Sequence, residues 1–82
     1  MEETKLVAST DTYEILIDDA KKYYIYVKIN DKKFLVNTAS EEKEVNTSLY
    51  TIHNERMQKE AEEFHEVLTQ FRNYIDKENK DE

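Results

Sequence analysis

The chain has 82 residues, with 12 Lys and Arg against 19 Asp and Glu and a net charge of −7. It contains no cysteine, glycine or proline. These absences exclude disulfides, thiolate metal sites and the glycine-dependent loops of P-loop enzymes, dinucleotide-binding folds and serine hydrolases. We therefore expect one small domain over residues 1–82, without enzymatic activity, cofactor or metal.

The first half of the chain predicts strands, which together span about residues 4–38. Residues 4–10 fit a short strand or a loose arm, and the pattern does not decide between them. Three further strands are predicted from period-two alternation or from aromatic and β-branched residues, over 12–18, 23–29 and 32–38.

Side-chain alternation predicts which residues share a face of this sheet, because a one-residue slip would move each side chain to the other face. A two-residue turn at Asn30 and Asp31 places Val27 opposite Phe34. Two positions further along the ladder, Ile25 then faces Val36. With a short loop between the two preceding strands, the predicted inner face is Tyr13, Ile15, Ile17, Tyr23, Ile25, Val27, Phe34 and Val36.

The second half of the chain predicts a helix over about residues 48–77. Its apolar residues recur at alternating spacings of four and three, and they are Met57, Ala61, Phe64, Leu68, Phe71 and Ile75. Thr38 with Glu41 also fits a capping box, which would allow a short helical turn before the main helix. The expected fold class is α+β, with two layers: an antiparallel sheet of three to four strands, followed by one long C-terminal helix packed on one face. The charged end, about residues 77–82, is predicted to be a disordered acidic tail.

A second apolar line on the same helical wheel points away from the first stripe. It consists of Leu49, Ile52, Val67 and Tyr74. One face of so small a sheet cannot easily cover both lines. Either a kink near residues 52–56 or a contact between two copies would resolve this, and we expect a homodimer that uses these four residues.

The outer face of the sheet is the predicted partner-binding surface. It carries Leu16, Tyr24, Tyr26, Lys28, Lys33 and Leu35. Tyrosine beside lysine on a sheet is typical of surfaces that stack bases of single-stranded nucleic acid. Tyrosine beside leucine is typical of protein interfaces. Glu14 and Asp18 share the face and the net charge is acidic, which argues against nucleic acid and favours a protein partner. An ordinary exposed strand face is the third interpretation.

The predicted helix also carries a surplus of carboxylates. The acidic surface consists of Glu55, Glu60, Glu62, Glu63 and Glu66. Such a surface is usually only a solvated face, but it can also imitate a phosphate backbone and occupy a basic groove on a partner. Glu62 and His65 have the Glu-x-x-His spacing of di-iron bundles, but a single copy on one helix cannot complete such a site.

In general character the chain resembles small proteins of phages and mobile elements, which are short, rich in Lys, Glu, Asn and Tyr, and free of catalytic motifs. Many proteins of that class, anti-defence proteins among them, bind and inhibit a larger host protein. The leading hypothesis is a small acidic, non-enzymatic protein that inhibits or regulates a larger protein partner; the net negative charge fits a basic partner, but it also fits a role in solubility alone. The alternatives are a binder of single-stranded nucleic acid or a small nucleotide through the tyrosine face, and a helical mimic of nucleic acid. No run of about 18 apolar residues and no signal peptide is seen, so we expect a cytoplasmic location without membrane contact.

Overall fold

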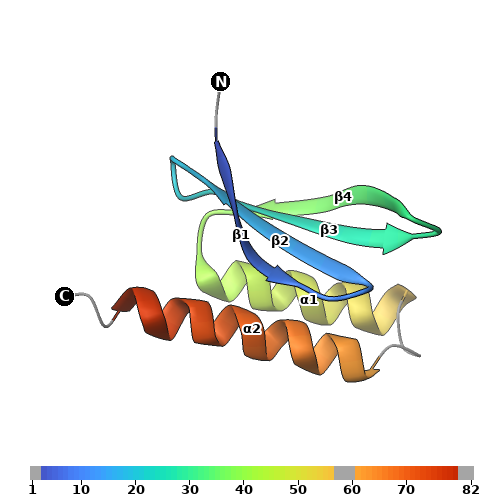
Figure 1. Cartoon of the computed structure of the whole chain (residues 1–82). Helices are drawn as coiled ribbons and strands as arrows, with labels where there is room; N and C mark the ends of the chain where they lie inside the picture. Colours follow the sequence, from blue (N-terminus) through green and yellow to red (C-terminus); the bar gives the residue numbers. More distant parts are fainter. Residues whose placement is uncertain (1–2, 57–60, 80–82) are drawn as a thin grey trace.

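The computed structural model describes residues 3–56 and 61–79. Its elements in chain order are β1 (Thr4–Ser9), β2 (Tyr13–Asp18), β3 (Tyr23–Ile29), β4 (Lys32–Ala39), α1 (Glu42–Arg56) and α2 (Ala61–Asn79). The strands form one antiparallel sheet in the order β1-β2-β3-β4, and both helices lie on the same face of it (Figure 1). The predicted α+β class with an antiparallel sheet followed by C-terminal helix is confirmed. The segment 4–10 contains a strand, which decides between the two alternatives left open for it.

The turn between β3 and β4 forms where the sequence predicts it. Asn30 and Asp31 have φ angles of 52° and 68°, which is the left-handed conformation that both central residues of a type I′ turn require. Asparagine and aspartate tolerate this conformation better than other residues with a Cβ atom. The turn sets Val27 opposite Phe34, as predicted.

A β-bulge in β4 changes the register beyond that point. Tyr26 pairs with Leu35, but Ile25 pairs with Asn37, so Val36 is the extra residue and the expected pair of Ile25 with Val36 does not form. The bulge turns Asn37 toward the helical layer, where its Nδ2 donates a hydrogen bond of 2.6 Å to Ser48 Oγ of α1. A contact between distant segments therefore accompanies the change of register.

Two residues predicted for the inner face are not buried in the core. Val36, at the bulge, is 38% exposed, and Phe34 is 48% exposed. Phe34 keeps the predicted register but lies on the edge strand, where it has a neighbouring strand on one side only. The other six predicted inner residues, Tyr13, Ile15, Ile17, Tyr23, Ile25 and Val27, are all buried.

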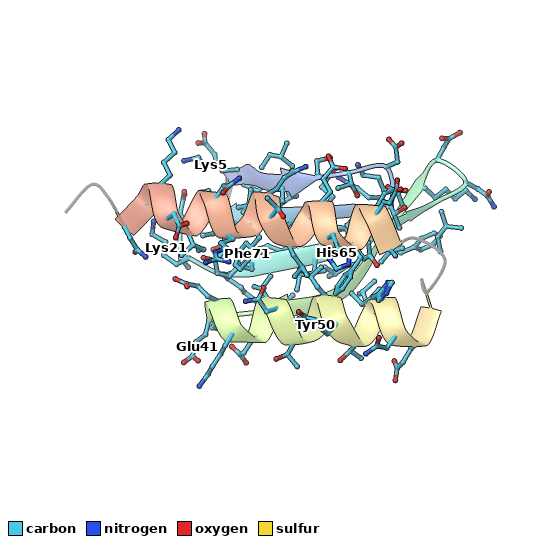
Figure 2. All side chains as sticks on the ribbon, turned by 90° about the horizontal axis from the view of Figure 1, so that it is seen from below. Lys5, Lys21, Glu41, Tyr50, His65 and Phe71 are labelled. Atoms are coloured by element: carbon cyan, nitrogen blue, oxygen red, sulfur yellow. The ribbon has the colours of Figure 1, made fainter. Side chains whose placement is uncertain are left out.

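The helical region differs from the prediction, because the structure contains two helices over the range for which one was expected. They run antiparallel and side by side beneath the sheet (Figure 1, Figure 2). The first helix begins earlier than predicted. Glu44 Oε1 accepts hydrogen bonds from the backbone N–H groups of Ser40 and Glu41, at 3.2 and 3.1 Å, which is the return half of a capping box.

The two helices together carry both apolar lines of the sequence and pack most of their side chains against the sheet. Phe64 and Phe71 of the first line are buried, and Leu68 and Ile75 pack partly against the core. Met57 lies outside the described residues, and Ala61 is exposed.

This arrangement corrects the prediction that Leu49, Ile52, Val67 and Tyr74 form a dimer contact. Leu49, Ile52 and Val67 are buried in the chain's own core, and Tyr74 packs partly against it. Leu49 and Ile52 belong to α1, whereas Val67 and Tyr74 belong to α2. Because each helix covers part of the sheet, both pairs of side chains face the core. Leu49, Ile52 and Val67 therefore do not form a surface that a second copy could contact, and Tyr74 is only partly covered.

Candidate functional site

The candidate site is the outer sheet face, defined as the side of the sheet opposite the helices. Among residues 3–56 and 61–79, no helix or strand covers it (Figure 1). The pairing register brings the predicted residues together: Leu16 lies opposite Tyr24, Tyr26 opposite Leu35, and Lys28 opposite Lys33. The structure thus places all six predicted partner-binding residues on one face.

An apolar strip crosses this face. Leu6 of β1 pairs with Leu16, which pairs in turn with Tyr24, and the next row holds Tyr26 and Leu35. The strip at its two ends is largely open, since Leu6 is 56% and Leu35 is 53% exposed. The sequence did not indicate Leu6, because a bulge between Leu6 and Ala8 breaks the alternation that would have assigned it to a face.

Asp18 fixes Tyr24 at one side of the strip. Its Oδ2 accepts a hydrogen bond of 2.7 Å from the Tyr24 hydroxyl, and its Oδ1 accepts bonds of 2.9 Å from the backbone N–H groups of Ala20 and Lys22. The N–H of Lys22, followed by the Tyr24 hydroxyl, lowers the pKa of Asp18 below its usual value. The ring of Tyr24 is therefore held by a carboxylate that is charged at neutral pH.

Lys33 contacts Tyr26 and is itself held in place by an ion pair with Glu14. Its Nζ lies 2.7 Å from Glu14 Oε2 and 5.0 Å from the centroid of the Tyr26 ring. The hydrogen bond from Lys33 is the main cause that lowers the pKa of Glu14, and the same bond raises the pKa of Lys33. The side chain of Lys33, on β4, thus extends over Tyr26 of β3 to reach Glu14 of β2.

Lys28 is also engaged within the face. Its Nζ lies 3.4 Å from Glu14 Oε1, and it donates hydrogen bonds to Ser9 Oγ at 3.1 Å and to the Thr10 carbonyl at 2.8 Å. Both lysines of the predicted site therefore share one carboxylate. This leaves them less able to bind a phosphate than the sequence suggested, because phosphate binding depends on cations that are free to neutralise it.

The predicted acidic surface is divided between the two helices. Glu55 is exposed on α1, Glu62 and Glu66 are exposed on α2, and Glu63 is partly buried. Glu60 lies outside the described residues. The described part of the chain contains no group of three metal-ligating side chains positioned to hold an ion.

Gln70 is a residue that sequence reasoning missed. Its Oε1 accepts a hydrogen bond of 2.8 Å from the Ser9 backbone N–H, and its Nε2 donates one of 3.0 Å to the Ser9 carbonyl. One side-chain amide therefore pairs with the outer edge of β1 as a neighbouring strand would. No local pattern could indicate this, because the partners are 61 positions apart.

Comparisons with known proteins give no further guide. No protein-family model matches the chain, and no curated protein or solved structure is significantly similar to it. Within the part of the chain that the structure describes, no helix has the length and apolar character needed to cross a bilayer.

Proposed function

We propose that this protein is a small non-enzymatic binding protein that inhibits or regulates a larger protein by docking through the outer sheet face. The observation that supports the proposal is the apolar strip of Leu6, Leu16, Tyr24, Tyr26 and Leu35, which the fold leaves open while the other face of the same sheet is packed. The inhibitory role is the one suggested by the chain's general likeness to phage and mobile-element proteins.

The strip has two properties that favour protein binding. Asp18 and Lys33 hold Tyr24 and Tyr26 in place before any partner arrives, so docking would order few additional side chains. Tyrosine also combines a large apolar area with a polar tip, which is why it is enriched at protein interfaces.

The charges of the face support the same choice. Glu14 is paired with Lys28 and Lys33, so a partner that covers the face would not leave this carboxylate buried and unpaired. The same ion pairs also neutralise part of the positive charge that could bind a nucleic acid. Mimicry by the acidic surface has less support, since Glu55 and Glu62 are on different helices.

A photo-crosslinking experiment tests the proposal. A benzophenone amino acid replaces Leu16, in the centre of the face, or Asn73, an exposed residue of α2, and each variant is irradiated in a lysate of the source cells. We expect a heavier adduct with a specific protein from position 16 and not from position 73. An excess of unlabelled wild-type chain should compete the adduct away.

The matched competitor is the double variant Tyr24→Ala and Tyr26→Ala, which should fail to compete while retaining a wild-type circular dichroism spectrum. Equal adducts from both positions, or equal competition by the double variant, would refute binding through this face. An adduct with the mass of two copies of this chain would show self-association instead of a partner.

A further inference from the structure

The two edge strands of the sheet differ in whether another segment pairs with their outward backbone groups. At the β1 edge, the Gln70 amide pairs with both backbone groups of Ser9, and α2 packs against the strand. At the β4 edge, α1 packs against the strand and Asn37 donates to Ser48, but within residues 3–56 and 61–79 the backbone of no other segment pairs with the free side of the strand. Residues 32–37 are all exposed.

The register shows which backbone groups of β4 face outward. In a hairpin with a two-residue turn, the residues that flank the turn form a hydrogen-bonded pair, and the pair type then alternates along the ladder. Ile29 and Lys32 flank the turn. Lys33 and Leu35 are therefore in non-hydrogen-bonded positions, and their N–H and C=O groups point away from β3.

A hydrogen bond on the far side of β3 agrees with this assignment. Lys28 lies opposite Lys33, and its backbone N–H donates to the carbonyl of Thr12, at 2.8 Å, toward the β2 side. The groups of Lys28 thus point away from β4, as they must if the Lys28–Lys33 pair is non-hydrogen-bonded.

The side chains of this edge are apolar on both faces. Phe34, Leu35 and Val36 follow one another, and they are 48%, 53% and 38% exposed. Edge strands are usually protected against pairing by a charged side chain, above all lysine. Lys33 does not serve that purpose here, because its Nζ reaches back over Tyr26 to Glu14.

We propose that two copies of the chain pair through their β4 edges, antiparallel and about a two-fold axis at Phe34. Lys33 of each copy then lies opposite Leu35 of the second copy, and these are the residues whose backbone groups point outward. Phe34 lies opposite Phe34 of the second copy in a non-hydrogen-bonded pair, where cross-strand side chains are closest and aromatic pairs are favourable.

Charge and the bulge distinguish this register from its neighbours. An axis at Lys33 would set two ammonium groups directly opposite one another, which is destabilising. An axis at Leu35 would carry the pairing into the bulge at Val36, where the ladder is interrupted. With the axis at Phe34, the hydrogen-bonded pairs end before the bulge, and Lys32 faces Val36 of the second copy.

The contact is short, so the dimer should be concentration-dependent. Stable specific interfaces bury roughly 1,200–2,000 Å² in total, and a contact centred on three residues of each chain falls below that range. The pairing would join the two sheets into one, with both outer sheet faces on the same side. It does not depend on the proposed function, because it uses the edge of the sheet: only Leu35 of the apolar strip lies at the contact, and the rest of the strip stays open.

A single cysteine tests the register, since the chain contains none of its own. In the proposed dimer, the Cα atoms at position 34 of the two copies are about 4.5 Å apart, a distance that a disulfide can span. We expect Phe34→Cys to form a disulfide-linked dimer several-fold faster under mild oxidation than the matched control Val36→Cys. Equal rates for the two variants would overturn the register.

A second measurement tests the pairing without an introduced cysteine. Sedimentation of the wild-type chain should show a mass that rises toward that of a dimer with concentration. Leu35→Pro removes an outward N–H that β3 does not use, so its circular dichroism spectrum should be unchanged and its mass should stay that of a monomer. A wild-type chain that stays monomeric at high concentration, or a proline variant that dimerises equally, contradicts the proposal.

Discussion

The two faces of the sheet are built by alternate residues of the same strands, yet their side chains are held in place by different means. On the inner face, Tyr13, Ile15 and Ile25 are fully buried against the helices. On the outer face, side chains that remain in contact with solvent are held by Asp18 and by the pairing of Glu14 with Lys33. The comparison teaches that a strand face can be ordered without being buried, provided that its polar groups bind one another.

Truncation on the inner face should have the largest effect. Ile25→Ala removes part of a side chain that has no exposed surface, and large-to-small substitutions of this kind cost about 2–5 kcal/mol of stability. Urea denaturation followed by circular dichroism measures the free energy of unfolding. A smaller loss of unfolding free energy than in the double variant Tyr24→Ala and Tyr26→Ala would contradict the distinction between the two faces.

Truncation on the outer face should affect binding more than folding. We expect Tyr24→Ala combined with Tyr26→Ala to destabilise the chain by about 1 kcal/mol, because both rings are only partly buried, and to abolish partner capture. Denaturation and affinity measurements on the same preparation separate the two effects. Leu68→Ala, a partly buried residue on the helical side, is the control that should leave binding intact.

The Asp18 hydrogen bonds predict a pH dependence for the outer face. Because the pKa of Asp18 is lower in the folded than in the unfolded chain, its contribution to stability is fully present above the unfolded value of about 3.9 and is lost as the pH falls through the folded value. Asp18→Asn should therefore be less stable than the wild type at neutral pH, and this difference should shrink below about pH 4. Urea denaturation at several pH values tests this, and a difference that does not change with pH would contradict it.

The smallest predicted effect concerns a tyrosine on the helical side. Burial, followed by the nearby charge of Glu78, raises the pKa of Tyr74 to about 12. Its contribution to stability is therefore present below the unfolded pKa of about 10 and is lost as the pH rises through the folded value. Absorbance titration of tyrosinate should show a late-ionising group that is missing in Tyr74→Phe. A titration identical to that of the wild type would argue against it.

The sequence predicted the faces of β2 and β3 well, because their apolar residues alternate and the Asn30–Asp31 turn sets the pairing. It did not predict the bulge in β4, since Phe34, Leu35 and Val36 are all apolar and give no sign of which one is the extra residue. The hydrogen bond that accompanies the bulge, from Asn37 to Ser48, is a contact between a strand and a helix, which a local pattern does not show.

The division of the helix was predicted only in part: a kink near residues 52–56 was one of two alternatives, and α1 ends at Arg56. No glycine or proline interrupts the chain, so its helical periodicity predicted one element. The apolar line through Leu49, Ile52 and Val67 did carry the information that a single helix was insufficient, and the fold satisfies it by placing a second helix under the sheet. The outer sheet face was predictable, but its ion pairs were not, because they join side chains from different strands.

The bond between Gln70 and Ser9 also has a consequence for the order of events during synthesis. β1 is the first strand to be made, whereas the amide that covers its edge follows 61 positions later. Until α2 has been made and has docked, the nascent sheet has two open edges, and exposed strand edges are sites of aggregation. The last helix therefore completes the core and closes the first strand in the same step, so a chain that ends before Gln70 would leave β1 open to pairing.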